Sequence, residues 1–154
     1  MEAIVTAGLT RSFGDNRAVN NLNLSVSAGE VFGLVGPDGA GKTTVMRLLA
    51  GLMAPTSGDA WVYGCNTVKD SDALKHHISY MPQRFGLYLD LTVQENIDFY
   101  ADLYNVPRQT RREKISELLS FSNMTPFRDR QARNLSGGMK QKLALACALV
   151  HTPK

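Results

Sequence analysis

The stretch Gly36-Pro37-Asp38-Gly39-Ala40-Gly41-Lys42-Thr43-Thr44 follows the pattern G-x-x-x-x-G-K-[ST], which is typical of a phosphate-binding loop, or P-loop. The apolar run 31–35 precedes it, and such a run is typical of a buried parallel strand. Apolar residues recur at helical spacing over 45–52 behind it. The sequence therefore predicts a strand, a glycine-rich turn and a helix in that order, which is the context that the motif requires.

The residue types in this stretch suit the binding of a phosphate chain. Glycines let the backbone bend with no Cβ in the way, and the amide groups can then point inward as an anion-binding nest. The helix that follows presents its positive dipole end to the same anion. We expect Lys42 to reach the β- and γ-phosphates, the Thr43 hydroxyl to ligate Mg²⁺ and Thr44 to make a further phosphate contact. The alternative, a glycine-rich turn that arose by chance, is disfavoured by the flanking elements.

The composition is that of an ordinary soluble globular protein. The chain has 154 residues, with 44% hydrophobic and 20% charged residues, which is enough for one domain with a core. The net charge of +3 is too weak to argue for a nucleic-acid partner. Cys65 and Cys147 show no metal-binding spacing and sit in apolar surroundings. We therefore expect two buried free thiols rather than a disulfide.

Nothing in the sequence predicts a membrane span. No apolar run approaches the length that would cross a bilayer, and the N-terminal residues do not resemble a secretory signal. Any work at a membrane is therefore expected to go through a partner.

Local patterns predict several short strands in the first half of the chain. Residues 3–9 form a first strand, and Gly, Asp and Asn residues within 11–16 predict a turn. Apolar and polar residues alternate over 22–26, which indicates a half-exposed strand. Further short strands are expected at 60–63 and, buried and stopped by a proline, at 78–81.

Helices are predicted mainly in the second half. A short one is expected over 72–77. The spacing of Thr92 and Glu95 is that of a capping box, which opens a helix to about Tyr104. An amphipathic helix follows over about 109–121. Ser136 is expected to cap a last helix that is apolar almost all round from 143 to 150 and therefore largely buried.

The stretch LSGGMKQ at 135–141 resembles the signature motif of ATP-binding cassette (ABC) proteins. A serine cap followed by two glycines opens a helix whose exposed amide groups can receive a phosphate. The resemblance implies that this phosphate belongs to ATP held by the P-loop of a second unit, in a head-to-tail dimer with two ATP molecules between P-loop and signature. The signature residues implied in this way are Leu135, Ser136, Gly137, Gly138, Met139 and Gln141.

Two further segments match this family. Tyr80-Met81-Pro82-Gln83 resembles the Q-loop, and the resemblance implies that Gln83 contacts Mg²⁺ or the attacking water while its loop senses the membrane subunit. Phe13 lies where the family places an aromatic ring on the adenine, a contact worth about 0.5–1.5 kcal/mol. By itself an aromatic residue beside a turn is more often part of a core. By resemblance, Lys42 and Gln83 are the catalytic candidates, with ATP and Mg²⁺ as cofactors.

The resemblance covers nearly the whole chain and implies an α/β fold: a P-loop NTPase core with an N-terminal antiparallel β subdomain and an α-helical subdomain. The implied parts are about 1–85 for the β subdomain and P-loop core, about 86–140 for the helical subdomain, and 141–154 for the signature helix. The segments GPDGAGKTT, YMPQRFGLY-x-DLTVQEN and LSGGMKQK are most similar to ATP-binding subunits of ABC-2 type drug exporters. Asp38 departs from the Asn or Ser more usual at its position, so its carboxylate is expected to point away from the phosphates.

The sequence lacks the family's Walker B strand with its Asp-Glu end, the D-loop and the switch histidine. We therefore expect these residues alone to hydrolyse ATP slowly or not at all, with exposed sheet edges that favour aggregation. The leading interpretation is the energy-coupling subunit of a multidrug exporter, bound to membrane-spanning subunits at the cytoplasmic face of the inner membrane and without nucleic acid. Two alternatives stay open: a soluble ABC-type ATPase that acts outside transport, and a nucleotide-binding remnant without turnover.

Overall fold

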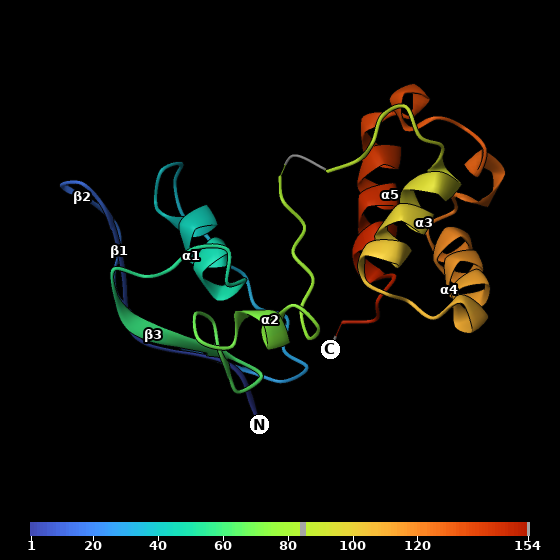
Figure 1. Cartoon of the computed structure of the whole chain (residues 1–154). Helices are drawn as coiled ribbons and strands as arrows, with labels where there is room; N and C mark the ends of the chain where they lie inside the picture. The colour runs from blue at the N-terminus through green and yellow to red at the C-terminus, as the bar shows by residue number, and fades with distance from the viewer. Residues whose placement is uncertain (84–85, 154) are drawn as a thin grey trace. The chain divides into compact units, whose positions relative to one another are not determined.

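A computed structural model of the chain describes residues 1–83 and 86–153. The chain divides into two compact units, Met1–Ile78 and Ser79–Lys154. Figure 1 shows the first unit as a curved sheet with one main helix and the second as a helical unit.

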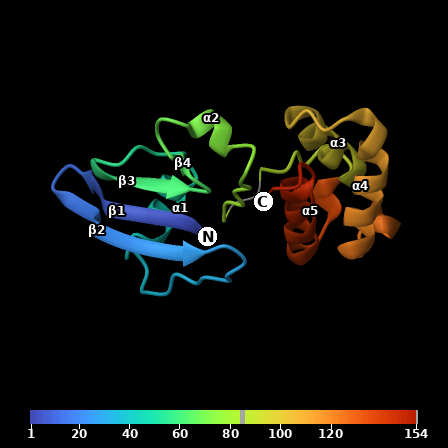
Figure 2. The same cartoon turned by 90° about the horizontal axis from the view of Figure 1, so that it is seen from below.

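The first unit is built on an antiparallel sheet in the order β2-β1-β3-β4, which can be followed in Figure 2. The central strand β1 (Glu2–Phe13) pairs with β2 (Asn16–Ser27) on one side and with β3 (Ser57–Val62) on the other. The short β4 (Cys65–Asn66) closes the far edge against β3. Val5 faces Ser25 in one pairing and Trp61 in the other, which fixes the register of the sheet.

One helix covers this sheet. The helix α1 (Lys42–Leu49) sits within the curve of the sheet (Figure 1) and turns Val45, Leu48 and Leu49 inward, as their helical spacing predicted. The four-residue helix α2 (Ser71–Leu74) adds one fully buried leucine. The buried residues of this core are Leu9, Val19, Val45, Leu48, Leu49, Ala60, Val62 and Leu74.

The strands and helices of this unit differ from the predictions mainly at their ends. The hairpin strands continue so far that only Gly14 and Asp15 form the turn expected over 11–16. The P-loop helix ends at Leu49, and Leu52 is 58% exposed rather than part of its apolar face. Gly51 in the left-handed region ends the helix earlier than the periodicity suggested.

The strand predictions at 31–35 and 78–81 are wrong for this chain. Neither segment forms a strand among the described residues, and Val31 and Val35 are 100% and 96% exposed. A strand needs a hydrogen-bonding neighbour, and the described sheet pairs only β1 to β4 with one another.

The second unit consists of three main helices, which lie side by side in both views (Figures 1 and 2). They are α3 (Val93–Leu103), α4 (Arg108–Phe121) and α5 (Gly137–Leu149). Two 3-10 turns, η1 (Thr125–Phe127) and η2 (Ala132–Asn134), connect α4 to α5. The buried core residues include Ile97, Ile115, Leu119, Met124, Leu143 and Cys147.

The predicted capping box at the start of α3 is confirmed. The Glu95 amide donates to Thr92 Oγ1 at 3.1 Å, and the Thr92 amide donates to the Glu95 carboxylate at 2.7 Å. Hydrogen bonds from the Thr92 backbone and side chain to the Glu95 carboxylate favour its ionised form and therefore lower the pKa of Glu95. Two otherwise unpaired helix-start donors are satisfied within the chain itself.

Asn96, one residue further along α3, is fully buried, which the sequence analysis missed. Its side-chain amide donates to the carbonyls of Tyr88, Leu91 and Thr92 and accepts from the Tyr88 amide. It therefore holds the segment before α3 against the helix. A polar residue with all its bonds made can be buried at little cost.

Both cysteines are free thiols, as expected. Cys147 is buried on α5, and burial raises the pKa of its thiol to about 12. Cys65 is only half-buried, at the sheet edge, because the two-residue strand β4 covers little of it. The expectation of two buried thiols is thus right for Cys147 alone.

Candidate nucleotide-binding site

The P-loop sequence forms a tight turn pressed against the sheet. Gly39 and Gly41 adopt φ angles of 82° and 85°, a region that favours glycine. A Cβ on Gly41 would lie 2.1 Å from the carbonyl oxygen of Ala18 in β2. Only glycine therefore fits at position 41, and the requirement comes from the chain's own packing.

The start of α1 is left open by the chain. The N-cap residue of α1 is Gly41, which has no side chain that could bond to the helix-start amides. No acidic residue occupies the first turn of the helix. Helix-start amides without an internal partner carry the positive end of the helix dipole. This start is consequently suited to receive an anion.

Lys42, the first residue of α1, folds back across the turn. Its Nζ donates to the carbonyls of Gly36 at 2.7 Å and Pro37 at 2.6 Å. Carbonyl oxygens are the weaker acceptors, so a phosphate at this turn could replace them as partners of the ammonium group. The role of Lys42 toward the phosphates of a nucleotide stays a prediction.

The donor set fits a magnesium nucleotide rather than a metal held by protein alone. Thr43 is exposed and Thr44 is half-buried at the start of α1. The described residues contain no group of three or more His, Cys, Asp and Glu that could hold a metal ion. Mg²⁺ is commonly bound through few protein ligands together with phosphate oxygens and water, and the exposed Thr43 hydroxyl is compatible with one such ligand.

The tip of the turn is open to solvent. The Ala40 amide donates to the Pro37 carbonyl at 3.2 Å, which closes the turn around the exposed Asp38. The direction of the Asp38 carboxylate relative to a phosphate stays a prediction.

Phe13 lies at the end of the β1–β2 hairpin, opposite Asn16. Its ring is 45% exposed, so it is not part of the core. Ala18, two residues beyond Asn16, is the residue that crowds Gly41, which places the hairpin end near the P-loop turn. The role of Phe13 toward adenine stays a prediction.

Arg11 also belongs to this part of the surface and was not singled out by the sequence. Its guanidinium lies 4.7 Å from the centroid of the Phe13 ring and donates to the Ala54 carbonyl at 2.9 Å. A cation beside an aromatic face adds roughly 0.5–1 kcal/mol at an exposed site. The spacing of two residues along one strand, which puts both side chains on one face, was the signal that could have found it.

The signature sequence forms the start of α5 in the second unit. Ser136 is the N-cap, and its hydroxyl accepts from the Met139 amide at 3.3 Å, as predicted. A Cβ on Gly137 or Gly138 would meet nothing within 4 Å. Glycine is unfavourable in a helix by up to about 1 kcal/mol relative to alanine, so these glycines are not explained by the packing of this unit.

The rest of the signature divides into anchors and exposed positions. Leu135 is buried and Met139 packs against the helical core. Gln141 is exposed, as are Ser136 and the two glycines. Leu135 and Met139 therefore anchor the start of α5 in the helical core, while Ser136 and the two glycines stay accessible to solvent.

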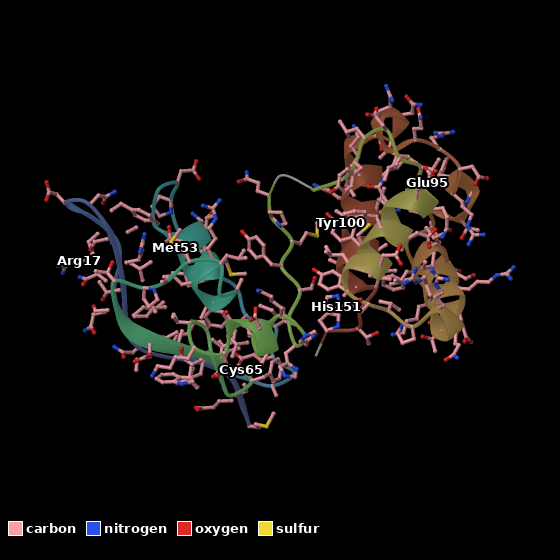
Figure 3. All side chains as sticks on the ribbon, in the orientation of Figure 1. Arg17, Met53, Cys65, Glu95, Tyr100 and His151 are labelled. Carbon is pink, nitrogen blue, oxygen red and sulfur yellow. The ribbon has the colours of Figure 1, made fainter. Side chains whose placement is uncertain are left out.

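Gln83 is exposed in a bend of the second unit. Arg84 and Phe85 of the Q-loop segment, like Lys154, lie outside the described residues. Behind the bend, Tyr80 and Pro82 line a cavity of about 50 Å³ together with Tyr100 and Cys147. Tyr100, labelled in Figure 3, donates from its hydroxyl to the Gly86 carbonyl at 2.6 Å. Gln83 thus belongs to the second unit, whereas the P-loop belongs to the first.

A profile of the ABC transporter family matches residues 19–154. The chain belongs to the ABC transporter family. Proteins of this kind bind ATP, typically with Mg²⁺, through domains that dimerise and work with membrane transporter subunits.

Two curated relatives differ in what they are named for. The chain is 53% identical over 156 aligned residues to the probable multidrug ABC transporter ATP-binding protein YbhF of Escherichia coli (strain K12), covering 99% of this chain and 27% of the relative. It is 35% identical to the Fe(3+) ions import ATP-binding protein FbpC of Pasteurella multocida (strain Pm70), covering 98% and 43%. The chain thus spans only about a quarter to a half of the length of these relatives, whose names include both export and import.

A solved structure confirms the predicted α/β ABC ATPase fold. The structure of the ATP-binding cassette MJ0796, described as a dimeric post-hydrolysis state bound to ADP and Pi, matches with a TM-score of 0.83 and 28% identity. The match covers 97% of this chain and 70% of that one. The described part of our chain contains no helix long and apolar enough to cross a membrane.

Proposed function

We propose that this chain is part of the ATP-binding subunit of an ABC-2 type exporter, which couples the binding and hydrolysis of ATP to multidrug efflux by a membrane-spanning partner. One observation carries the proposal: a single chain combines a P-loop lysine at an uncapped helix start with a second helix start whose two open glycines serve no internal packing. The 53% identity to a relative named as a multidrug transporter subunit supports the export assignment.

In this proposal the P-loop residues 36–44 hold the phosphates of ATP. Lys42 exchanges the Gly36 and Pro37 carbonyls for β- and γ-phosphate oxygens, and the first amides of α1 add donors. Thr43 supplies the hydroxyl ligand to Mg²⁺, and Thr44 contacts phosphate. Phe13 stacks on the adenine, with Arg11 steadying its ring.

The start of α5 binds the ATP of a second unit. Ser136 and the amides of Gly137 and Gly138 face outward, where the phosphate of a nucleotide held by another P-loop can approach. Two such chains would then bind head to tail around two nucleotides. The membrane-spanning partner would place this subunit at the cytoplasmic face of the inner membrane.

In our proposal, hydrolysis of ATP needs a carboxylate in addition to the P-loop and Gln83. Lys42 and Gln83 supply a cation and an amide for the attacking water, whereas the carboxylate that polarises this water is absent from the 154-residue sequence. The 154 residues by themselves are therefore expected to hydrolyse ATP slowly or not at all. In the complete subunit, Gln83→Ala should reduce transport more than hydrolysis, because its loop is proposed to report on the membrane partner.

The experiment compares Mg-ATP binding and turnover for the 154 residues and for a version extended at the C-terminus through the expected Walker B strand. We expect turnover only in the extended form. Turnover by the shorter form would mean that a carboxylate within these residues is catalytic and would refute this division of labour.

Import is the second candidate, favoured by the 35% identity to a subunit named for the import of Fe(3+) ions. The direction is measured with the complete transporter in inside-out vesicles. ATP-dependent accumulation of a drug substrate in the lumen supports export. ATP-driven movement only in the opposite direction would support import instead.

A further inference from the structure

A groove of about 430 Å³ lies between α3, α4 and the segment after η1, away from every residue assigned above. We call it the basic groove. The charged residues that line it are Asp98, Asp102, Arg108, Arg111, Arg112 and Arg128.

The two carboxylates of this groove are already engaged within the chain. Arg111 Nη1 lies 2.6 Å from Asp102 Oδ1 and forms an ion pair with it. The Gln94 side-chain amide donates to Asp98 Oδ2 at 2.9 Å. Among the described residues, Arg108, Arg112 and Arg128 have no ion pair, so the groove keeps an excess of positive charge.

Three polar atoms of the groove walls are screened from water and lack a hydrogen-bond partner in the described structure. They are Nε of Arg111, Nε of Arg128 and Oε1 of Gln94. Leaving such atoms unpaired is unfavourable, because they have lost their water partners without gaining new ones. The chain thus brings both donors and an acceptor to one place without satisfying them.

The start of α4 adds to the positive potential. Arg108, Arg111 and Arg112 stand three and four residues apart, so like charges face one another on the first turns. No acidic residue occupies the first turn, where the helix dipole already favours negative charge. This arrangement is unfavourable for the isolated chain and would be relieved by an anionic group in the groove.

Arg128 is fixed to the opposite wall by the backbone. The Gln94 amide donates to the Arg128 carbonyl at 3.0 Å, which ties the segment after η1 to the start of α3. Arginines from two separate segments therefore flank the groove, and its width is set by secondary structure rather than by a single mobile loop.

We propose that the basic groove docks an acidic segment of a partner protein, with its carboxylates between Arg108, Arg112 and Arg128. A peptide fits these walls better than a free phosphate does. An extended peptide can space its carboxylates so that each meets one of the arginines away from the two aspartates, whereas a free phosphate carries its whole charge at one point beside Asp98 and Asp102. The proposal is independent of nucleotide binding, since its residues are separate from the P-loop and the signature.

The test uses the 154-residue chain and a fluorescein-labelled peptide of alternating Glu and Ser, with the Gln-for-Glu peptide as its uncharged match. We expect the acidic peptide to bind, with an affinity that falls as salt rises, and the Gln peptide not to bind. The double variant Arg112→Gln, Arg128→Gln should weaken binding about tenfold. Arg17→Gln is the matched control, because Arg17 is an exposed arginine of the hairpin (Figure 3).

The same measurement excludes other sites and ligands. Unchanged binding by Lys42→Ala supports the groove, because it shows that the peptide does not occupy the P-loop. Equal weakening in the Arg17 variant would mean non-specific attraction and would overturn the proposal, as would no binding at all. Displacement by millimolar inorganic phosphate, or binding to vesicles with anionic lipid that is lost in the double variant, would assign the groove to phosphate or to membrane instead. Circular dichroism of each variant confirms that α4 is intact.

Discussion

The starts of α1 and α5 both offer amides to a phosphate, but the chain builds them in opposite ways. Gly41 at the start of α1 is required by the chain itself, since a Cβ there would run into Ala18. Gly137 and Gly138 at the start of α5 face open space. A glycine forced by its own chain is part of the fold, whereas the two glycines of α5 serve no packing within their unit and, in our proposal, face the phosphate of a second unit.

Lys42→Ala should have the largest effect of the substitutions considered, and this effect is on the binding of nucleotide at the start of α1. It removes the cation that lies across the P-loop turn, so the affinity for Mg-ATP should fall by about a hundredfold or more, as expected for a charge-assisted contact. Titration of a fluorescent ATP analogue measures this loss. Lys69→Ala, an exposed lysine of the same unit, is the control, and an unchanged affinity in the Lys42 variant would remove the P-loop assignment.

Gly41→Ala should have the next largest effect, now on the fold. The new Cβ meets backbone and also has to adopt a left-handed conformation, so the free energy of unfolding should fall by about 2 kcal/mol or more. Urea denaturation measures it. A stability equal to that of the unchanged chain would show that the P-loop turn is not pressed against β2.

Ser136→Arg tests the outward side of the α5 start in the complete protein. The large cation should block the approach of a second unit, so that ATP binding is retained while ATP-dependent dimerisation and turnover are lost. Gel filtration with ATP and a phosphate-release assay measure the two. Ordinary ATPase rates in this variant would refute the proposed nucleotide sandwich.

Gly137→Ala is the direct counterpart of Gly41→Ala and should have the opposite effect on stability. Alanine is the better helix former and meets no neighbour here, so the free energy of unfolding should stay the same or rise by up to about 1 kcal/mol. Urea denaturation again measures it. A large loss of stability would mean that the glycine serves the internal packing after all.

The start of α3 is a third helix start, and its own capping box satisfies its amides. Removing the charge of Glu95 from this box should have the smallest effect of the substitutions considered. The pKa of Glu95 is lowered in the folded chain by the Thr92 backbone and side chain. A carboxyl group whose pKa is lowered by folding stabilises the folded chain at pH values above its ordinary pKa of 4.5. This stabilisation is lost as the pH falls through the pKa of the folded state. Between about pH 5 and 3 the unchanged chain should therefore lose slightly more stability than Glu95→Gln, as followed by thermal melts. Parallel pH profiles of the two chains would contradict this.

Much of the local structure could be predicted from neighbours in the sequence. The Thr92–Glu95 capping box, the Ser136 cap and the helical spacing of Val45, Leu48 and Leu49 all depend on residues within a few positions of one another. The motifs at 36–44 and 135–141 identified the family for the same reason, and the family profile confirmed it. The ends of the elements were less accurate, because a terminus such as Leu49 depends on how the next residues pack.

Other features required the tertiary structure. The run 31–35 has the composition of a buried strand, but strands exist only through hydrogen bonds to distant segments, and the described sheet provides none for it. The contact of Gly41 with Ala18 and the meeting of Arg128 with the arginines of α4 likewise join residues that the sequence keeps apart. The sequence by itself thus determined the family, the helix starts and the candidate phosphate-binding residues. Only the tertiary structure decided which apolar runs are buried, which glycines the fold requires and where unpaired charges gather, because these depend on packing between segments far apart in the chain.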